Sequence, residues 1–115
     1  MSRIEYTWLV KPASFEKQVA VIVCDAFRCS YEDVLSSDKR RNVFYARATI
    51  AYVFRKYFCE TLVQIGERLN RDHSSITWSI QRIEELIIVN EGRFVEKLRG
   101  IEQRLGNEIF YDDAA

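Results

Sequence analysis

The sequence predicts an all-α protein, a compact bundle of five or six helices that contains a helix-turn-helix. Three observations support this prediction. One proline and four glycines interrupt the 115 residues, and no repeat or low-complexity run is present. Apolar residues recur at the spacing of helix faces over most of the chain. The contents of 48% apolar and 30% charged residues suit one soluble folded domain of this length.

We divide the chain into an N-terminal arm (1–13), a helical domain (14–105) and an acidic C-terminal tail (106–115) that contains Asp112-Asp113. In the arm, apolar residues alternate with other residues, which is closer to strand than to helix periodicity. The alternating residues are Ile4, Tyr6, Trp8 and Val10. We expect the arm to pack on the domain or on a partner, and its edge could pair two chains into a homodimer.

The first three helices follow from caps and apolar stripes. Ser14 is a candidate N-cap for a helix that ends near Cys29 and buries Phe15, Val19, Ile22 and Ala26. Ser30 and Asp33 form the pattern of a capping box, which predicts a short helix through Val34 and Leu35. A long helix over 42–58 follows, and its apolar stripe is Val43, Ala46, Ile50, Val53, Phe54 and Tyr57.

The next two helices form the predicted helix-turn-helix. Thr61 and Gln64 form a second capping box, and the short helix that they open is expected to weaken after Gly66. A turn through Asn70 leads to a second helix capped by Asp72. Its core face would contain Ile76, Ile80, Ile83 and Ile87, with Leu86 beside it. A last helix over 94–105 would bury Phe94, Leu98, Ile101 and Leu105.

The charges are unevenly distributed although 17 basic and 17 acidic residues balance over the chain. Between Lys39 and Arg82 lie nine basic and three acidic residues, a local excess of six positive charges. Such a basic segment between acidic ends is typical of a protein with one face on nucleic acid. The alternative is an ordinary solvated helix surface, which charge alone does not exclude.

The three cysteines indicate no disulfide framework and no metal site. Cys24 and Cys29 would point about 140° apart on a continuous helix, so we expect buried, reduced thiols at these positions and at Cys59. No apolar stretch approaches the roughly 20 residues of a membrane span, and the start of the chain lacks the apolar segment of a signal peptide. We therefore expect a cytoplasmic protein that does not bind a membrane.

The segment from Ile65 to Ile76, Ile-Gly-Glu-Arg-Leu-Asn-Arg-Asp-His-Ser-Ser-Ile, resembles the signature of the C-terminal duplex-DNA-binding domain of DnaA-type bacterial replication initiators. Lys39-Arg40-Arg41 and Ala46-Arg47, followed by an apolar helix, are similar to that family's basic loop and the helix after it. The resemblance covers roughly residues 15–105 and implies a Trp-repressor-like helix-turn-helix that binds double-stranded DNA.

The resemblance also implies roles for individual residues. Asp72, His73 and Ser74 would read base edges in the major groove, and the chemistry of these side chains suits that role. Lys39, Arg40 and Arg41 would enter the minor groove, where the negative potential over A·T-rich sequence is strongest. The expected phosphate contacts are Arg47, Arg71, Ser75 and Arg82. Asp72 could alternatively serve only as a cap, His73 could pack against Trp78, and Arg68 and Arg71 could be ordinary solvated charges.

The sequence departs from the family in three respects. The turn Arg68-Leu69-Asn70 is one residue shorter than usual and lacks the usual two glycines, although Asn70 can adopt a left-handed conformation. Ser74 and Ser75 stand where threonines are usual, so the threonine methyl group would not be available to contact thymine. The chain contains no phosphate-binding loop of the ATPase to which the family attaches this domain, so we predict neither nucleotide nor other cofactor.

The functional prediction is sequence-specific recognition of double-stranded DNA, similar to initiator-box recognition, in replication control or transcription regulation. The alternative is a protein-interaction module that kept the fold and lost DNA binding, with Tyr6, Trp8 and Trp78 as anchors. Catalysis is not predicted, because His73 is the only histidine and its neighbours Asp72 and Ser74 each diverge from it by about 100° on a helix.

Overall fold

The computed structural model describes residues 15–110 and shows a helical bundle over this range. No strand occurs among these residues, which confirms the predicted all-α class. The helices are α2 (Phe15–Phe27), α3 (Tyr31–Leu35), α4 (Arg41–Phe58), α5 (Leu62–Leu69), α6 (His73–Ile88) and α7 (Gly92–Leu105), followed by a π-helical turn, η1 (Gly106–Phe110). The arm predicted over 1–13, its Tyr6 and Trp8 included, lies outside the described residues.

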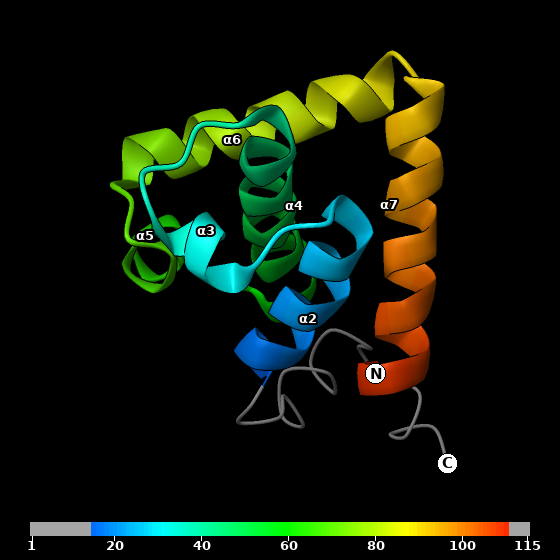
Figure 1. Cartoon of the computed structure of the whole chain (residues 1–115), viewed down its shortest axis with the longest axis horizontal. Helices are drawn as coiled ribbons and strands as arrows, with labels where there is room; N and C mark the ends of the chain where they lie inside the picture. The colour runs from blue at the N-terminus through cyan, green and yellow to red at the C-terminus, as the bar shows by residue number, and fades with distance from the viewer. Residues whose placement is uncertain (1–14, 111–115) are drawn as a thin grey trace.

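Helix α4 forms the centre of the bundle and packs against α2, α3, α5 and α6. Figure 1 shows α6 crossing one end of α4, and α7 descending beside α2. The short helices α3 and α5 lie on the side of the bundle away from α7. This arrangement brings the start of α6 close to the connection between α3 and α4.

The core follows the apolar stripes with three exceptions. Phe54 and Val19 are fully buried, as are most of the predicted core residues of α2, α4 and α7. Ala26, Tyr57 and Ile87 are only partly buried, because each lies at the edge of its apolar stripe. On α6 it is Leu86 rather than Ile87 that enters the core, so the buried face is rotated slightly from the predicted one.

Both capping boxes are present. The Ser30 hydroxyl accepts from the Asp33 amide, and the Asp33 carboxylate accepts from the Ser30 amide. Thr61 and Gln64 make the same reciprocal pair at the start of α5. The predicted weakening of α5 after Gly66 is wrong, because the helix continues to Leu69 and ends only at the left-handed Asn70.

Arg68 is a structural residue rather than a solvated charge. Its Nε lies 2.5 Å from Oε1 of Glu60 and its Nη1 lies 2.8 Å from Oε1 of Glu16. The guanidinium also lies 4.7 Å from the centroid of the Phe15 ring, within cation–π range. Glu60 is 4% exposed, so its pair with Arg68 is shielded from water, and the pair with Glu16 joins α5 to α2. Arg68 thus contributes to the fold and not to a basic surface.

The cysteines differ from the prediction of three buried thiols. All three are free, but Cys29 is only partly buried and Cys59 is exposed. Cys24 and Cys29 also contact each other, because α2 ends at Phe27 and Arg28 adopts a left-handed conformation with φ of 59° that turns Cys29 back. Burial, with the neighbouring Cys29, raises the pKa of Cys24 to about 12, which keeps this thiol protonated at neutral pH.

Candidate nucleic-acid interface

The turn between α5 and α6 is fixed by Gly66 and Asn70. Asn70 has φ of 60° and ψ of 44°, the left-handed conformation that the sequence predicts for it. This reversal lets the Arg71 amide donate to the Gly66 carbonyl oxygen at 2.8 Å. A Cβ on residue 66 would overlap the carbonyl oxygen of Arg71, so only glycine allows the turn to pack this closely.

Asp72 caps α6, as the sequence predicts. Its Oδ1 accepts from the Ser75 amide at 2.8 Å, and this bond lowers the pKa of the Asp72 carboxyl. The carboxylate is therefore charged at neutral pH and remains exposed at the beginning of the helix. The first turn of α6, from His73 to Ser75, is exposed as well. Capping and contact with an external group are thus compatible at this residue.

The α3–α4 loop (residues 36–40) is held by a buried arginine. Arg47 on α4 is 6% exposed. Its Nε donates to the Val34 carbonyl oxygen at 2.7 Å, and its Nη2 donates to the carbonyl oxygens of Asp33, Ser36 and Asp38 at 3.3, 3.2 and 3.1 Å. The loop is therefore shaped around this guanidinium.

This position changes the interpretation of Arg47, for which the sequence suggested only a phosphate contact. Burial lowers the pKa of Arg47, and the four carbonyl oxygens stabilise its charge in place of a carboxylate. The four hydrogen bonds to these oxygens use Nε and Nη2, and the residue also lines a surface groove between the loop and α6. A phosphate contact would thus have to use Nη1, and it stays a prediction.

The three predicted minor-groove residues differ in how they are held. Arg40 donates from Nε to Oδ2 of Asp38 at 2.9 Å, and its Nη2 lies 3.3 Å from Asp33. The Asp38 bond raises the pKa of Arg40 and lowers that of Asp38. Arg41 lies 5.5 Å from the centroid of the Tyr45 ring. Lys39 lines the surface groove between the loop and α6.

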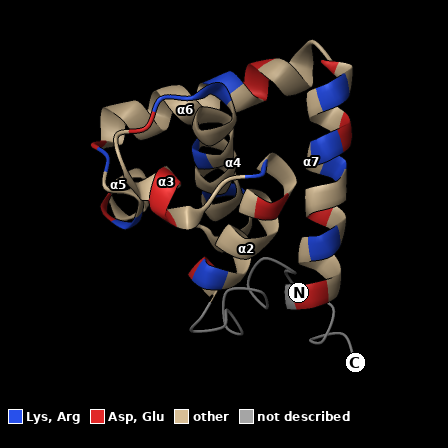
Figure 2. Cartoon of the chain, viewed as in Figure 1, with Lys and Arg blue, Asp and Glu red and all other residues tan. Residues whose placement is uncertain are grey.

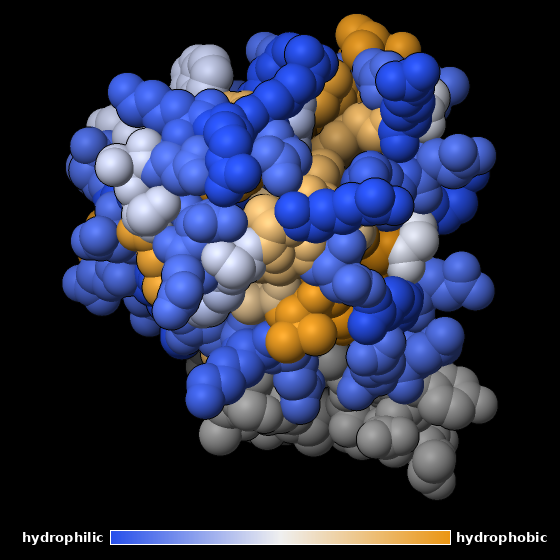
Figure 3. Space-filling view, viewed as in Figure 1, coloured by the Kyte–Doolittle hydropathy of each residue, from blue (hydrophilic) through white to orange (hydrophobic). Residues whose placement is uncertain are grey.

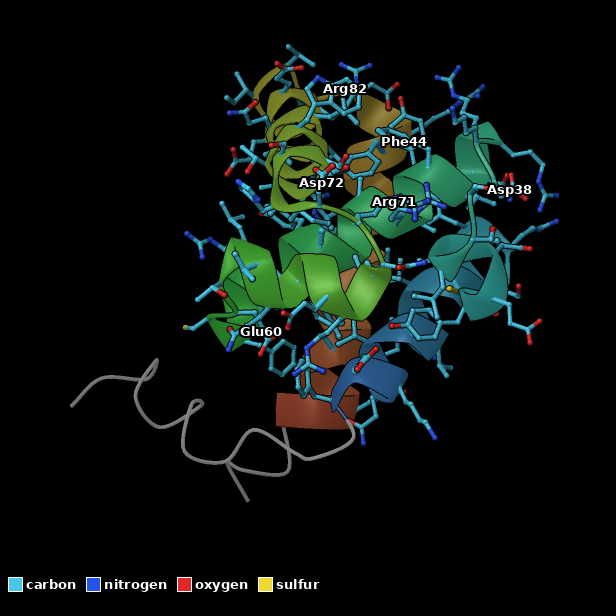
Figure 4. The ribbon with its side chains drawn as sticks, turned by 90° about the vertical axis from the view of Figure 1, so that its left-hand side faces the viewer. Asp38, Phe44, Glu60, Arg71, Asp72 and Arg82 are labelled. Carbon is cyan, nitrogen blue, oxygen red and sulfur yellow. The ribbon has the colours of Figure 1, made fainter. Side chains whose placement is uncertain are left out.

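Arg71 links the turn to the loop. Its Nη2 donates to the carbonyl oxygen of Ser36, and its Nη1 donates to the carbonyl oxygen of Asn70 at 3.0 Å. Figure 4 shows Arg71 between the start of α6, marked by Asp72, and the side of the loop that carries Asp38. Because the bond to Ser36 joins residues 35 positions apart, Arg71 is not an ordinary solvated charge.

A surface groove separates the α3–α4 loop from the first half of α6, and we call it the loop–helix groove. Its lining residues are Ser37, Lys39, Phe44, Arg47, Arg71, Ser74, Ser75, Trp78 and Ser79. Five of these were predicted DNA contacts from separate parts of the sequence: Lys39, Arg47, Arg71, Ser74 and Ser75. The fold brings them together in one place and combines three cations with several hydroxyl groups.

The sequence predicted only part of the aromatic lining of this groove. Trp78 is 59% exposed, and its ring centroid lies 5.6 Å from that of Phe44. Trp78 thus packs against Phe44, to which the sequence pattern assigned no role. The signal available was the position of Trp78 off the isoleucine stripe of α6, but its partner depends on how α4 and α6 cross.

The other predicted site residues lie outside this groove. Asp72 and His73 line a shallow hollow between α5 and the turn, together with Val63, Gly66, Glu67, Asn70 and Arg71. Arg82 lies two turns further along α6, where its Nη1 is 3.4 Å from Glu85. The predicted base-reading residues therefore occupy two adjoining surfaces at the start of α6.

The described part of the chain offers little else for chemistry. No cluster of three or more His, Cys, Asp or Glu residues suited to a metal ion occurs in residues 15–110. None of the helices in that range is both long enough and apolar enough to cross a membrane. Figure 2 shows lysines and arginines in the α3–α4 loop and along α7, in both places together with acidic residues.

Comparison with known proteins gives consistent matches. The profile of the family described as "Bacterial dnaA protein helix-turn-helix" matches residues 17–83. The chromosomal replication initiator protein DnaA of Thermosipho africanus (strain TCF52B) is 34% identical over 86 residues, 75% of this chain and 19% of the relative. The protein of the same name from Gloeobacter violaceus is 32% identical over 98 residues, 84% of this chain and 21% of the relative. The chain spans about a fifth of the length of these curated relatives.

Proposed function

This chain belongs to the bacterial DnaA helix-turn-helix family, and from that premise we propose that it binds double-stranded DNA in a sequence-specific way. The observation that carries the proposal is the loop–helix groove, where Lys39, Arg47 and Arg71 meet the hydroxyl groups of α6. A basic loop beside the exposed start of a helix is the arrangement by which helix-turn-helix proteins hold a backbone and read bases.

In the major groove, α6 would enter with its first turn. Asp72 would accept a hydrogen bond from a cytosine amino group, since its lowered pKa keeps it ionised. His73 and Ser74 would bond neighbouring base edges, and each is exposed for such contact. The turn conformation supports this role, because Asn70 and Gly66 bring the helix start to the surface without the family's usual two glycines.

In the adjacent minor groove, the α3–α4 loop and the first residue of α4 would insert Lys39, Arg40 or Arg41. Lys39 and Arg41 make no ion pair within the described residues, whereas Arg40 would have to exchange Asp38 for DNA. This exchange favours Lys39 and Arg41 as the inserted residues at moderate salt, because leaving Asp38 has an electrostatic cost.

The phosphodiester backbone between these two grooves would cross the loop–helix groove. A duplex whose major groove holds α6 and whose minor groove holds the loop has one strand between them, and the loop–helix groove is the space that this strand would occupy. Arg71, Ser75 and Nη1 of Arg47 would contact its phosphates, and the exposed Trp78 would pack on its deoxyribose. Arg82, further along α6, would contact a phosphate outside this groove.

The biological role would be replication control or transcription regulation. The relatives are named chromosomal replication initiators, and the region matched contains the helix-turn-helix. Recognition of sites similar to initiator boxes is therefore part of the proposal. The serines at 74 and 75 would shift the preferred sequence, because they lack the threonine methyl group that contacts thymine.

Selection of bound duplexes from a random library, followed by affinity measurements at several salt concentrations, tests the proposal. We expect enrichment of a short motif beside an A·T-rich stretch. Replacing Asp72, His73 or Ser74 by Ala is expected to relax base preference and to cost on the order of 1 to 3 kcal/mol on the best site. Arg71→Ala is expected to weaken all duplexes alike. Absence of enrichment with weak, wholly salt-dependent binding would favour the protein-interaction module instead.

A further inference from the structure

A second basic groove lies beyond the end of the α3–α4 loop, where the start of α4 meets α6 and α7, and we call it the α7 groove. Four basic residues from three helices line it: Arg41 of α4, Arg82 of α6, and Arg93 and Lys97 of α7. Arg41 follows directly after the loop, so positive charge continues from the loop–helix groove across the loop to α7. Neither the family resemblance nor the comparisons assign a role to Arg93 or Lys97.

Aromatic rings hold two of these cations over the groove floor. The Lys97 ammonium lies 5.1 Å from the centroid of the Phe27 ring and donates to the Ala26 carbonyl oxygen at 3.0 Å. The Arg41 guanidinium lies 5.5 Å from the centroid of the Tyr45 ring. Both side chains are therefore positioned in the free protein, which reduces the entropy lost when an anion binds.

Few carboxylates compete for these cations. Glu91 is the one acidic residue among those lining the groove, and its Oε1 accepts from the Phe94 amide at 2.8 Å as the N-cap of α7. Glu85 lies 3.4 Å from Arg82, but its side chain is 65% exposed, so this pair contributes little and is easily exchanged. No carboxylate is paired with Arg93 within the described residues. The groove thus suits an anionic ligand.

The position of the two grooves relative to the basic residues 39–41 indicates that ligand. Lys39 lines the loop–helix groove and Arg41 lines the α7 groove, so the basic run lies between two cationic grooves. A minor groove is about 6 Å wide and is bounded by a backbone on each side. If the loop enters a minor groove, one bounding strand would cross the loop–helix groove and the other would reach the α7 groove.

We propose that the α7 groove binds phosphates of the second strand, so that the loop is clamped in the minor groove between two backbones. This inference rests on the proposed DNA-binding function and extends the interface from the helix-turn-helix to α7. Figure 3 shows the face concerned, on which hydrophilic side chains border a strip of more apolar ones. Arg93 and Lys97 are the residues whose contact would be new.

Phosphate ethylation interference on the best duplex tests the proposal. For the unmodified protein we expect interference at phosphates of both strands that bound one minor groove. Arg93→Gln with Lys97→Gln is expected to abolish interference on one strand only. Arg93→Gln alone leaves the Lys97 hydrogen bond to Ala26 intact and is expected to weaken interference at the same phosphates, which separates a missing phosphate contact from a defect in folding.

Salt dependence gives the second readout. The slope of log affinity against log salt is expected to be less steep by about 1 for Arg93→Gln and by about 2 for the double variant, with roughly tenfold weaker binding at 0.1 M salt for each cation removed. Arg99→Gln, on an exposed position of α7 that does not line the groove, is the matched control and is expected to bind nearly as the unmodified protein does.

The outcomes separate the two proposals. Specific binding with the same interference pattern and slope in the double variant would overturn the α7 clamp and leave the DNA-binding function standing. Equal weakening by Arg99→Gln would also overturn it, since general electrostatics would then explain the effect. Failure of the unmodified protein to bind any duplex specifically would remove the DNA-binding function itself, and the clamp with it.

Discussion

The turn before α6 and the loop before α4 both present predicted DNA contacts, but they are built differently. The turn is fixed by neighbours in sequence: the left-handed Asn70, the Gly66 carbonyl oxygen four residues earlier, and the Asp72 cap. The loop is fixed by Arg47, which reaches back from α4 to four carbonyl oxygens 9 to 14 residues away. A local device can be predicted from the sequence, whereas a distant one depends on the fold.

This difference also bears on how the two parts would act on DNA. The turn can hold its shape once α5 and α6 have formed. The loop keeps its shape only while α4 and α3 are packed, because Arg47 is on one and its acceptors lie in and after the other. Arg71, through the Ser36 carbonyl oxygen, is the residue that couples the two parts. Substitutions can therefore break one part while sparing the other.

Arg47→Lys is expected to have the largest effect. Lysine keeps the charge but cannot supply two nitrogens at the required positions, so several carbonyl oxygens lose their donor. We expect the free energy of unfolding to fall by about 3 kcal/mol. Chemical denaturation measures this change, and amide hydrogen exchange is expected to rise in residues 33–38 more than in the turn. A stability equal to that of the unmodified protein would show that the guanidinium does not shape the loop.

Gly66→Ala breaks the turn instead. The added methyl group would overlap the Arg71 carbonyl oxygen, and α6 would have to shift, at a cost of about 2 kcal/mol. The matched control is Gly100→Ala on α7, where a Cβ meets nothing within 4 Å, and this change is expected to stabilise the helix by about 0.5 to 1 kcal/mol. Thermal unfolding compares the two. Stabilisation by both substitutions would mean that the turn has room for the methyl group.

The sequence predicted the helices and the turn well because their signals are local. Capping boxes at Ser30 and Thr61 and the left-handed Asn70 each depend on residues within a few positions, and all were confirmed. The wrong prediction for α5 followed from treating Gly66 as a weak helix residue, whereas here its missing Cβ is what the close turn requires. At this position the close packing of the turn outweighs the low helix propensity of glycine.

The candidate site was less predictable because it depends on side chains from different helices. Arg68 and Arg47 look alike as surface charges in the sequence, yet one forms a shielded pair with Glu60 and the other holds a loop. Phe44 gave no signal, since its contact with Trp78 arises only where α4 and α6 cross. The resemblance supplied residue roles, but which of them share a groove required the fold.

Asn70 tests how the shortened turn compensates for its lack of glycine. Asn70→Ala is expected to lower the free energy of unfolding by about 1 kcal/mol, because a Cβ without a local polar group disfavours the left-handed conformation. Asn70→Gly is expected to change it by only a few tenths of a kcal/mol. Denaturant titration of the unmodified protein and the two variants measures these free energies of unfolding. If alanine were tolerated as well as glycine, the left-handed residue would not be what sets the turn.

The smallest expected effect is on stability at acidic pH. The turn and the loop each contain a carboxyl group with a lowered pKa. The pKa of Asp72 is lowered by the bond from Ser75 and that of Asp38 by the bond from Arg40. Because the unfolded pKa of aspartate is about 3.9, the stability from these groups is fully present above that pH and is lost as pH falls through their folded values.

Asp72→Asn keeps an N-cap acceptor, so we expect the free energy of unfolding to be nearly unchanged at pH 7. In acid, we expect this variant to lose less stability than the unmodified protein does. Urea unfolding midpoints between pH 3 and pH 7 measure this pH dependence, and Asp38→Asn is the corresponding variant in the loop. If Asp72→Asn left the pH dependence unchanged, the cap would not depend on the carboxylate charge.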